Sequence, residues 1–169
     1  MEEVKSRKYW SISLFSLIFL LSGAENPLHA SSFPANGPYL TLASNTFIFN
    51  PRSRSWKAVQ NGKVVKTGKA SGGSNYCRDI KRACRTPSGT YHIISKGGAN
   101  CRSSRYPLGG GGAKMPYCMF YSKYYAIHGS YDVPNYNASH GCIRVRPSDA
   151  LWLHRNFIKI GTKVVVLPY

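Results

Sequence analysis

Residues 126–146 limit the fold most, because this stretch must bring one cysteine within reach of two histidines. Cys142 follows His140 by two positions. Ten residues separate His128 from Ser139, and they are rich in glycine, proline, aspartate and asparagine, a composition typical of turns. Such a loop closes at modest entropic cost. We therefore expect the fold to place His128 beside Cys142.

This pairing has a specific chemical use. A thiol attacks a carbonyl carbon as its thiolate, so a catalytic cysteine needs a nearby base or a field that lowers its pKa. His128 is the base that we predict. Gly141 allows a sharp turn just before Cys142, and the backbone amides of such a turn can face one oxyanion. The stretch thus predicts a cysteine nucleophile with an oxyanion hole.

Three segments carry a resemblance to a known family. They are residues 85–93 (RTPSGTYHI), residues 115–120 (MPYCMF), and His128-Gly129 followed after the loop by residues 139–144 (SHGCIR). In this order they resemble the L,D-transpeptidase catalytic domain of bacterial cell-wall enzymes, over residues 45–169. The resemblance implies a mainly β fold, a β-sandwich with one short helix after the cysteine.

The resemblance also implies a function. It is that of a peptidoglycan L,D-transpeptidase, which forms a cysteine thioacyl-enzyme on tetrapeptide stems and then cross-links or trims them. In that reading Cys142 is the nucleophile and His128 is the base, oriented by the Gly129 carbonyl. The amides of His140, Gly141 and Cys142 hold the oxyanion. The residues expected to contact substrate are Ser139, Arg144 and Tyr117, and no cofactor or metal is expected.

The N-terminus predicts export. Lys5, Arg7 and Lys8 precede an uncharged apolar run over residues 9–21, and small residues follow it. We expect a signal peptide over residues 1–30, cleaved after Ala24 or Ala30, with an uncleaved anchor as the alternative. The protein would then act in the periplasm or cell envelope, or be secreted.

The remainder predicts one domain. Residues 31–45 indicate a linker or irregular lead, and residues 46–169 the catalytic domain. Strands are expected over residues 46–50, 56–60, 63–69, 91–95, 115–121, 123–128 and 161–167, with Asn61-Gly62 as a tight hairpin turn. A helix is expected from Pro147 to about Asn156, and a long loop over residues 96–112.

Five cysteines in an exported chain indicate two disulfides and one free thiol. If Cys142 is free, the other four allow three connectivities, among which the sequence does not choose. We favour Cys77–Cys84 as a local loop closure and Cys101–Cys118 as a staple of the glycine-rich loop. These four cysteines depart from the pattern expected of most family members.

The net charge of +17 predicts an anionic partner. We expect peptidoglycan stems and anionic cell-envelope polymers, with no nucleic acid and a monomeric protein. The main alternative is a non-catalytic basic module that binds the cell envelope. A secreted ribonuclease would need neither the cysteine nor the glycine before it. A zinc site of His92, His128, His140 and Cys142 has unfavourable spacing.

Overall fold

The computed structural model describes residues 44–169. The signal peptide predicted over residues 1–30 and all but the last two residues of the predicted lead lie outside this range. Within the described residues, no helix is long and apolar enough to cross a membrane.

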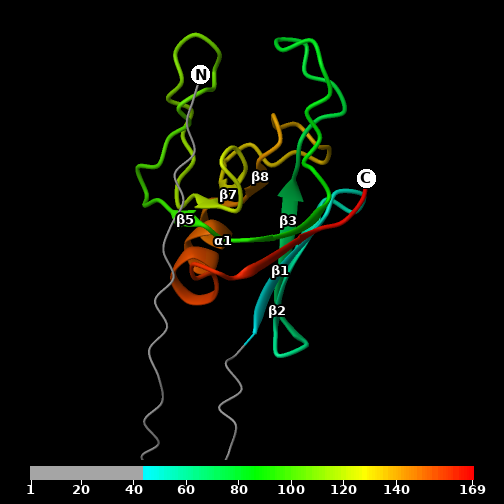
Figure 1. The fold of residues 1–169 in the computed structure, drawn as a ribbon, viewed down its shortest axis with the longest axis vertical. Helices are drawn as coiled ribbons and strands as arrows, with labels where there is room; N and C mark the ends of the chain where they lie inside the picture. Colours follow the sequence, from blue (N-terminus) through cyan, green and yellow to red (C-terminus); the bar gives the residue numbers. More distant parts are fainter. Residues whose placement is uncertain (1–43) are drawn as a thin grey trace, which may run out of the picture. The chain divides into compact units, whose positions relative to one another are not determined.

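Nine strands of residues 44–169 form one sheet. Figure 1 shows its arrangement. In chain order they are β1 (Asn45–Asn50), β2 (Ser55–Gln60), β3 (Lys63–Ser71), β4 (Gly89–His92), β5 (Ser95–Lys96), β6 (Met119–Phe120), β7 (Ala126–Gly129), β8 (Ile143–Val145) and β9 (Lys163–Val166). Their spatial order is β4-β9-β1-β2-β3-β8-β7-β6-β5. The predicted mainly β fold is confirmed.

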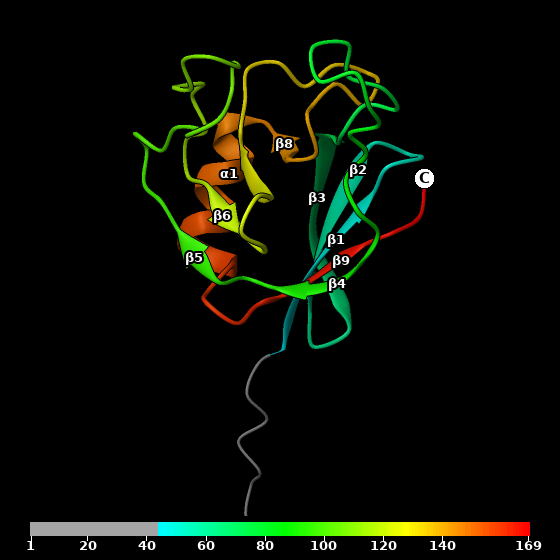
Figure 2. The same ribbon diagram turned by 45° about the horizontal axis from the view of Figure 1, so that its top comes forward.

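This sheet curls strongly, and its two halves share strand β3. Strands β4 and β5 stand at opposite ends of the spatial order, yet only Ile93 and Ile94 separate them in the chain. The Ile93 amide donates to the Thr162 carbonyl near β9, and the Ile94 amide donates to the Phe120 carbonyl of β6. The two edges of the sheet therefore meet at this bend (Figure 2).

The core is formed by side chains on one face of the strands, where every second residue points inward. In β1, Phe47 and Phe49 are fully buried while their neighbours are partly exposed, as expected when one face of a strand packs inward. The Trp56 ring of β2 stacks on Phe47 with ring centroids 5.8 Å apart. Strand β7 is buried at every position, because both faces of it are covered.

The predicted helix after the cysteine is present in two parts. Helix α1 (Pro147–Trp152) begins with proline in its first turn, where the missing amide hydrogen costs nothing, and packs against β7. It continues as the π-helical turn η1 (Leu153–Phe157). The Lys96 ammonium donates to the carbonyls of His154 and Ile158, at 2.6 and 2.7 Å, and so satisfies carbonyls at the end of the helix.

Several strand predictions were too long. The hairpin at Asn61-Gly62 is confirmed, with both residues at positive φ. Residues 115–118 are irregular where a strand was predicted, because Tyr117 has a φ of 55° and Cys118 is held in a disulfide. The strand predicted over residues 123–128 starts only at Ala126, and the one over residues 91–95 breaks into β4 and β5.

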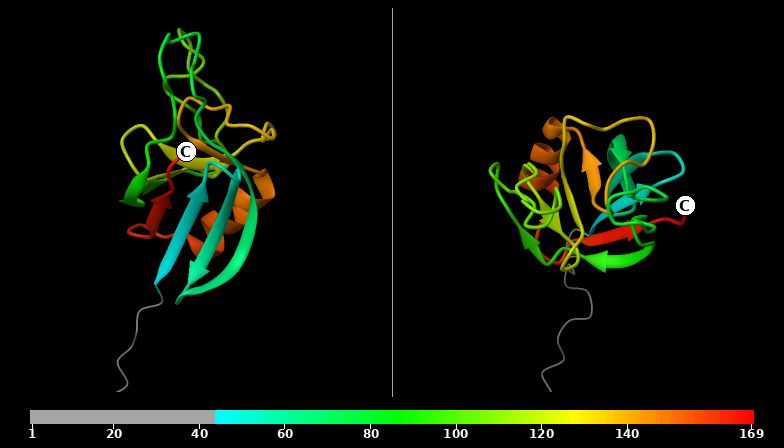
Figure 3. Two further views of the ribbon diagram at one scale, coloured as in Figure 1. Left: turned by 90° about the vertical axis from the view of Figure 1, so that its right-hand side faces the viewer. Right: turned by 90° about the horizontal axis from the view of Figure 1, so that it is seen from above.

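Both favoured disulfides, Cys77–Cys84 and Cys101–Cys118, are present, and Cys142 is free. The first closes a short loop after β3, and the second closes the glycine-rich loop between β5 and β6. Both loops extend beyond the same end of the sheet (Figures 1 and 3). We call them the first and second cystine loops, residues 77–84 and 101–118.

Candidate active site

Strands β7 and β8 bring the predicted nucleophile and base together. They are parallel neighbours, and His128 lies opposite Arg144 in their register. Side chains two positions apart on a strand share a face, so Cys142, one residue before β8, faces the same side as Arg144. His128, Cys142 and Arg144 therefore share one side of the sheet, while Ile127 and Ile143 are buried in the core.

That side opens into a cavity of about 600 Å³ that contains His128, His140 and Cys142 in its lining. The two cystine loops and the β6–β7 connection form its walls. Among the lining residues, seven are basic and a single one is acidic: Arg82, Arg85, Arg102, Arg105, Lys114, Lys123 and Arg144 against Asp132. Asp132 is already paired with Arg144 at 2.6 Å. The cavity is therefore suited to an anionic molecule.

His128 has the geometry of a neutral base. Its Nδ1 lies 2.9 Å from the Gly129 carbonyl oxygen, which can only accept, so Nδ1 carries the hydrogen and Nε2 is left as the basic nitrogen. Burial lowers the pKa of His128 to about 4, so the imidazole is unprotonated at neutral pH. The orientation by Gly129 that the sequence predicts is present.

Gly129 is closely packed, and a side chain there would need its neighbours to move. A Cβ there would lie 3.0 Å from Pro116 Cγ and 3.2 Å from the Ala150 methyl, and the Gly129 amide donates to the Pro116 carbonyl at 2.8 Å. This close packing of α1 and residue 116 against β7 fixes the carbonyl that orients His128.

Cys142 is partly buried, and burial raises the pKa of its thiol. The Ala126 backbone and the Arg144 guanidinium oppose this increase. The nucleophile therefore rests as a thiol and needs the neutral His128 to accept its proton.

Ser139 organises the turn that precedes the nucleophile. Its side chain is buried, and its Oγ donates to the Cys142 carbonyl at 2.5 Å and accepts from the Gly141 amide at 3.0 Å. The Gly141 amide is therefore occupied, which leaves the amides of His140 and Cys142 for the predicted oxyanion hole. Ser139 also lies in the lining of the cavity, so its predicted contact with substrate stays a prediction.

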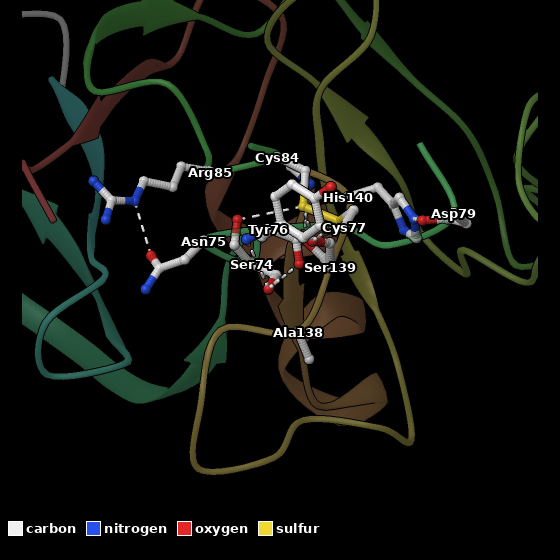
Figure 4. Close-up of a disulfide and its surroundings, with 12 residues drawn as sticks. Ser74, Asn75, Tyr76, Cys77, Asp79, Cys84, Arg85, Ala138, Ser139 and His140 are labelled. Carbon is white, nitrogen blue, oxygen red and sulfur yellow. Dashed lines mark hydrogen bonds and ion pairs between the residues drawn. A yellow bond between two sulfur atoms is a disulfide. The ribbon is translucent and has the colours of Figure 1, made fainter. Parts of the chain in front are cut away.

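Ser139 is in turn held by the segment after β3. Its amide donates to the Gly72 carbonyl at 2.9 Å, and its carbonyl accepts from the Ser74 amide at 2.8 Å. The same carbonyl contacts the sulfurs of Cys77 and Cys84 at 3.8 and 3.6 Å (Figure 4). Because disulfide sulfurs carry no hydrogen, these are packing contacts. The first cystine loop thus abuts the turn that carries the nucleophile.

Both cystine loops also contact His140. Its Nε2 lies 2.9 and 2.8 Å from the two carboxylate oxygens of Asp79 in the first loop (Figure 4). Its ring stacks on Tyr106 of the second loop, with centroids 4.2 Å apart. Sequence reasoning missed both partners. The position of Asp79 between two cysteines was the available signal.

The structure removes Tyr117 from the predicted substrate contacts. Tyr117 lies outside the cavity lining, and its ring packs against His154 with centroids 5.7 Å apart. The irregular backbone before β6 turns it into the core region, a path that alternation along a strand does not anticipate.

The described residues include two groups of candidate metal ligands. His92 lies on β4, next to β9, whereas His128 and Cys142 lie on the other half of the sheet. Cys77, Asp79 and His140 offer ligand atoms within 4.8 Å of one another, but the Cys77 sulfur is bonded to Cys84. A disulfide sulfur is not a thiolate ligand.

A model of the L,D-transpeptidase catalytic domain matches residues 44–166, most of the chain. The chain belongs to this family. Its sequence resemblance and its curled, mainly β fold agree with that assignment. A search of curated proteins found no match.

Solved structures of L,D-transpeptidases share the fold. One from Xylanimonas cellulosilytica is 26% identical, with a TM-score of 0.62, and the alignment covers 76% of this chain and 62% of that one. One from Mycobacterium smegmatis is 18% identical, with a TM-score of 0.62 and coverage of 75% and 59%. L,D-transpeptidase 3 from Mycobacterium tuberculosis, in complex with a faropenem-derived adduct, is 20% identical, with a TM-score of 0.61 and coverage of 75% and 61%. This L,D-transpeptidase family member thus spans about 60% of the length of these relatives.

Proposed function

We propose that this protein is a peptidoglycan L,D-transpeptidase that acts on tetrapeptide stems outside the cytoplasmic membrane. The observation that carries the proposal is the placement of His128 on β7 and of Cys142 directly before the parallel neighbour β8, with both residues in the lining of one basic cavity. Family membership supplies the reaction class.

The first half-reaction forms a thioacyl-enzyme. His128 Nε2 accepts the Cys142 proton as Sγ attacks the acyl carbonyl of the stem, and the amides of His140 and Cys142 stabilise the oxyanion. The protonated His128 then donates this proton to the departing amine, so that the carbon–nitrogen bond breaks and a thioester remains. His128 is again neutral.

The second half-reaction resolves the thioester. A side-chain amine of another stem gives its proton to His128 and attacks the thioester carbonyl, which yields a cross-link and returns the proton to the Cys142 sulfur. Water in the same role trims the stem. The basic lining of the cavity favours stems, which carry free carboxylates.

The deciding experiment is the intact mass of the purified protein after incubation with a carbapenem under non-reducing conditions. A β-lactam is an acyl donor, and the faropenem-derived adduct of the Mycobacterium tuberculosis relative supports this choice of probe. We expect one adduct per wild-type chain and none on Cys142→Ala. Release of the terminal residue from a synthetic tetrapeptide then tests the natural reaction.

A wild-type chain that gains no adduct and releases nothing from the tetrapeptide would overturn the proposal. The alternative, a non-catalytic basic module that binds the cell envelope, would then be favoured by the charge of the protein.

A further inference from the structure

His140 is held by one residue from each cystine loop. Asp79 lies two positions after Cys77, and Tyr106 lies within the loop closed by Cys101 and Cys118. These loops are separate in sequence, yet both converge on the histidine that stands two residues before the nucleophile. In the proposed reaction His140 contributes only its backbone amide. Its imidazole ring, which contacts both loops, has no role in that reaction.

The contact with Asp79 is specific for an N–H donor. Both carboxylate oxygens lie within 2.9 Å of the same nitrogen, Nε2, and a carboxylate only accepts. Nε2 therefore carries a hydrogen and donates to Asp79. Consistent with this, the hydrogen bond from His140 lowers the pKa of Asp79.

The first disulfide fixes where this carboxylate stands. Cys77 and Cys84 close the loop that contains Asp79, and both sulfurs rest on the Ser139 carbonyl, next to His140 in the chain. The Cys77 amide also donates to the Arg82 carbonyl across the loop at 2.9 Å. The loop is thus anchored at the turn whose histidine it contacts (Figure 4).

We propose that Asp79 is a positioning residue that fixes the His140 imidazole in the wall of the cavity, and with it the turn that presents Cys142, and that the Cys77–Cys84 disulfide maintains this arrangement. His140 lines the cavity and Asp79 does not, so the imidazole is the inner member of the pair. His140 and Cys142 belong to one tight turn, so a ring held at its outer end by Asp79 restricts where the turn places the thiol and the two amides of the oxyanion hole. The inference rests on the proposed role of Cys142 as nucleophile.

Other charged and titratable groups face the same space. Tyr121 and Arg144 interact electrostatically with Cys142, Tyr106 stacks on His140, and the other charged or titratable residues that line the cavity include His128, Arg82, Arg85, Arg102, Arg105, Lys114, Lys123 and Asp132. They are unchanged when Asp79 alone is substituted, so a difference between variants reports on the carboxylate.

The test is the pH dependence of Cys142 alkylation by iodoacetamide, without reductant and read by intact mass. The other four cysteines are in disulfides, so only Cys142 reacts. The variants are Asp79→Asn, Asp79→Glu as the conservative replacement, and Cys77→Ser/Cys84→Ser. Asp149→Asn is the matched control, since it removes a carboxylate that pairs with Lys66 away from the cavity.

We expect Asp79→Asn to shift the alkylation profile and to slow the reaction at neutral pH by roughly threefold to tenfold, because the turn then holds Cys142 less firmly in its place. Asp79→Glu should recover part of this loss. The variant without the first disulfide should show a similar shift. Adding Asp79→Asn to it should change little, because both substitutions disrupt the same contact between Asp79 and His140.

The inference would be overturned if Asp79→Asn and the disulfide variant both kept the wild-type alkylation profile, as Asp149→Asn should. Alkylation needs no substrate, so unchanged alkylation profiles would overturn only this inference. The proposed function fails by a different result, a wild-type chain that the carbapenem leaves unmodified. Thermal unfolding of each variant separates a general loss of folding from the expected change in profile.

Discussion

Gly141 determines the shape of the turn at the nucleophile. Its φ of 119° lies in a region that residues with a side chain rarely adopt, and an added Cβ would overlap the Tyr125 ring. The turn therefore packs against the β6–β7 connection at a distance that only glycine allows.

We expect Gly141→Ala to reduce carbapenem capture by at least about tenfold, because the strained turn displaces Cys142 and the amides beside it. The measurement is the rate of adduct formation by intact mass. Gly110→Ala is the matched control: Gly110 lies in the second cystine loop and a Cβ there meets nothing within 4 Å. Equal rates for the two variants would contradict this account of the turn.

The buried His128 makes stability depend on pH. Its pKa is about 4 in the folded state and near 6.5 when the chain is unfolded, so the unfolded state binds the extra proton between these values. Stability from this group is complete above about pH 6.5 and is lost as the pH falls towards 4.

We expect the free energy of unfolding to fall by up to about 3 kcal/mol over that interval through His128 alone. Denaturant unfolding at several pH values, compared between wild type and His128→Gln, measures this contribution. The difference between the two chains should narrow towards pH 4. Parallel stability curves would show that His128 titrates normally in the folded protein.

At the scale of elements, the C-terminal residue ties β9 to the segment that supports the site. The Tyr169 hydroxyl accepts from the Thr86 amide at 3.0 Å and donates to the Gly73 carbonyl at 2.8 Å. Gly73 lies between the two residues whose backbones bond to Ser139. The end of the chain thus stabilises the turn that carries Cys142.

We expect Tyr169→Phe to lower the free energy of unfolding by about 1–2 kcal/mol, since it leaves a buried amide and a carbonyl without their partner. Thermal or denaturant unfolding measures the change. Tyr131→Phe is the control, because Tyr131 is 94% exposed. A Tyr169→Phe chain as stable as the control would show that water replaces the hydroxyl.

At the scale of the whole molecule, positive charge dominates. Each of the three acidic side chains in the described residues has a partner: Asp79 with His140, Asp132 with Arg144 and Asp149 with Lys66. Most of the lysines and arginines are left without a carboxylate, and seven of the basic side chains line the cavity. The protein should therefore attract polyanions.

We expect binding to polyglutamate to weaken steeply as ionic strength rises from about 0.1 to 1 M, over which the Debye length falls from about 10 to 3 Å. Isothermal titration of wild type and Cys142→Ala should give the same affinities, because the thiol contributes no charge to the surface. Affinity that is insensitive to salt would indicate recognition by contacts other than charge.

The sequence by itself determined much of this protein. The Asn61-Gly62 hairpin, the mainly β fold, the helix after the cysteine and the presence of His128 and Cys142 in one site were predicted from local composition, spacing and resemblance. The odd number of cysteines predicted two disulfides and a free thiol, but their pairing was only favoured among three connectivities. Such features depend on backbone preferences and short-range patterns, which neighbouring residues encode directly.

Only the tertiary structure decided which groups are free to act. The Gly141 amide is occupied by Ser139, Tyr117 turns away to His154, and His140 is held by Asp79 and Tyr106. These contacts join segments that are far apart in the chain or depend on an irregular backbone. Their geometry is set by how the two loops and the curled sheet pack, which no local pattern specifies.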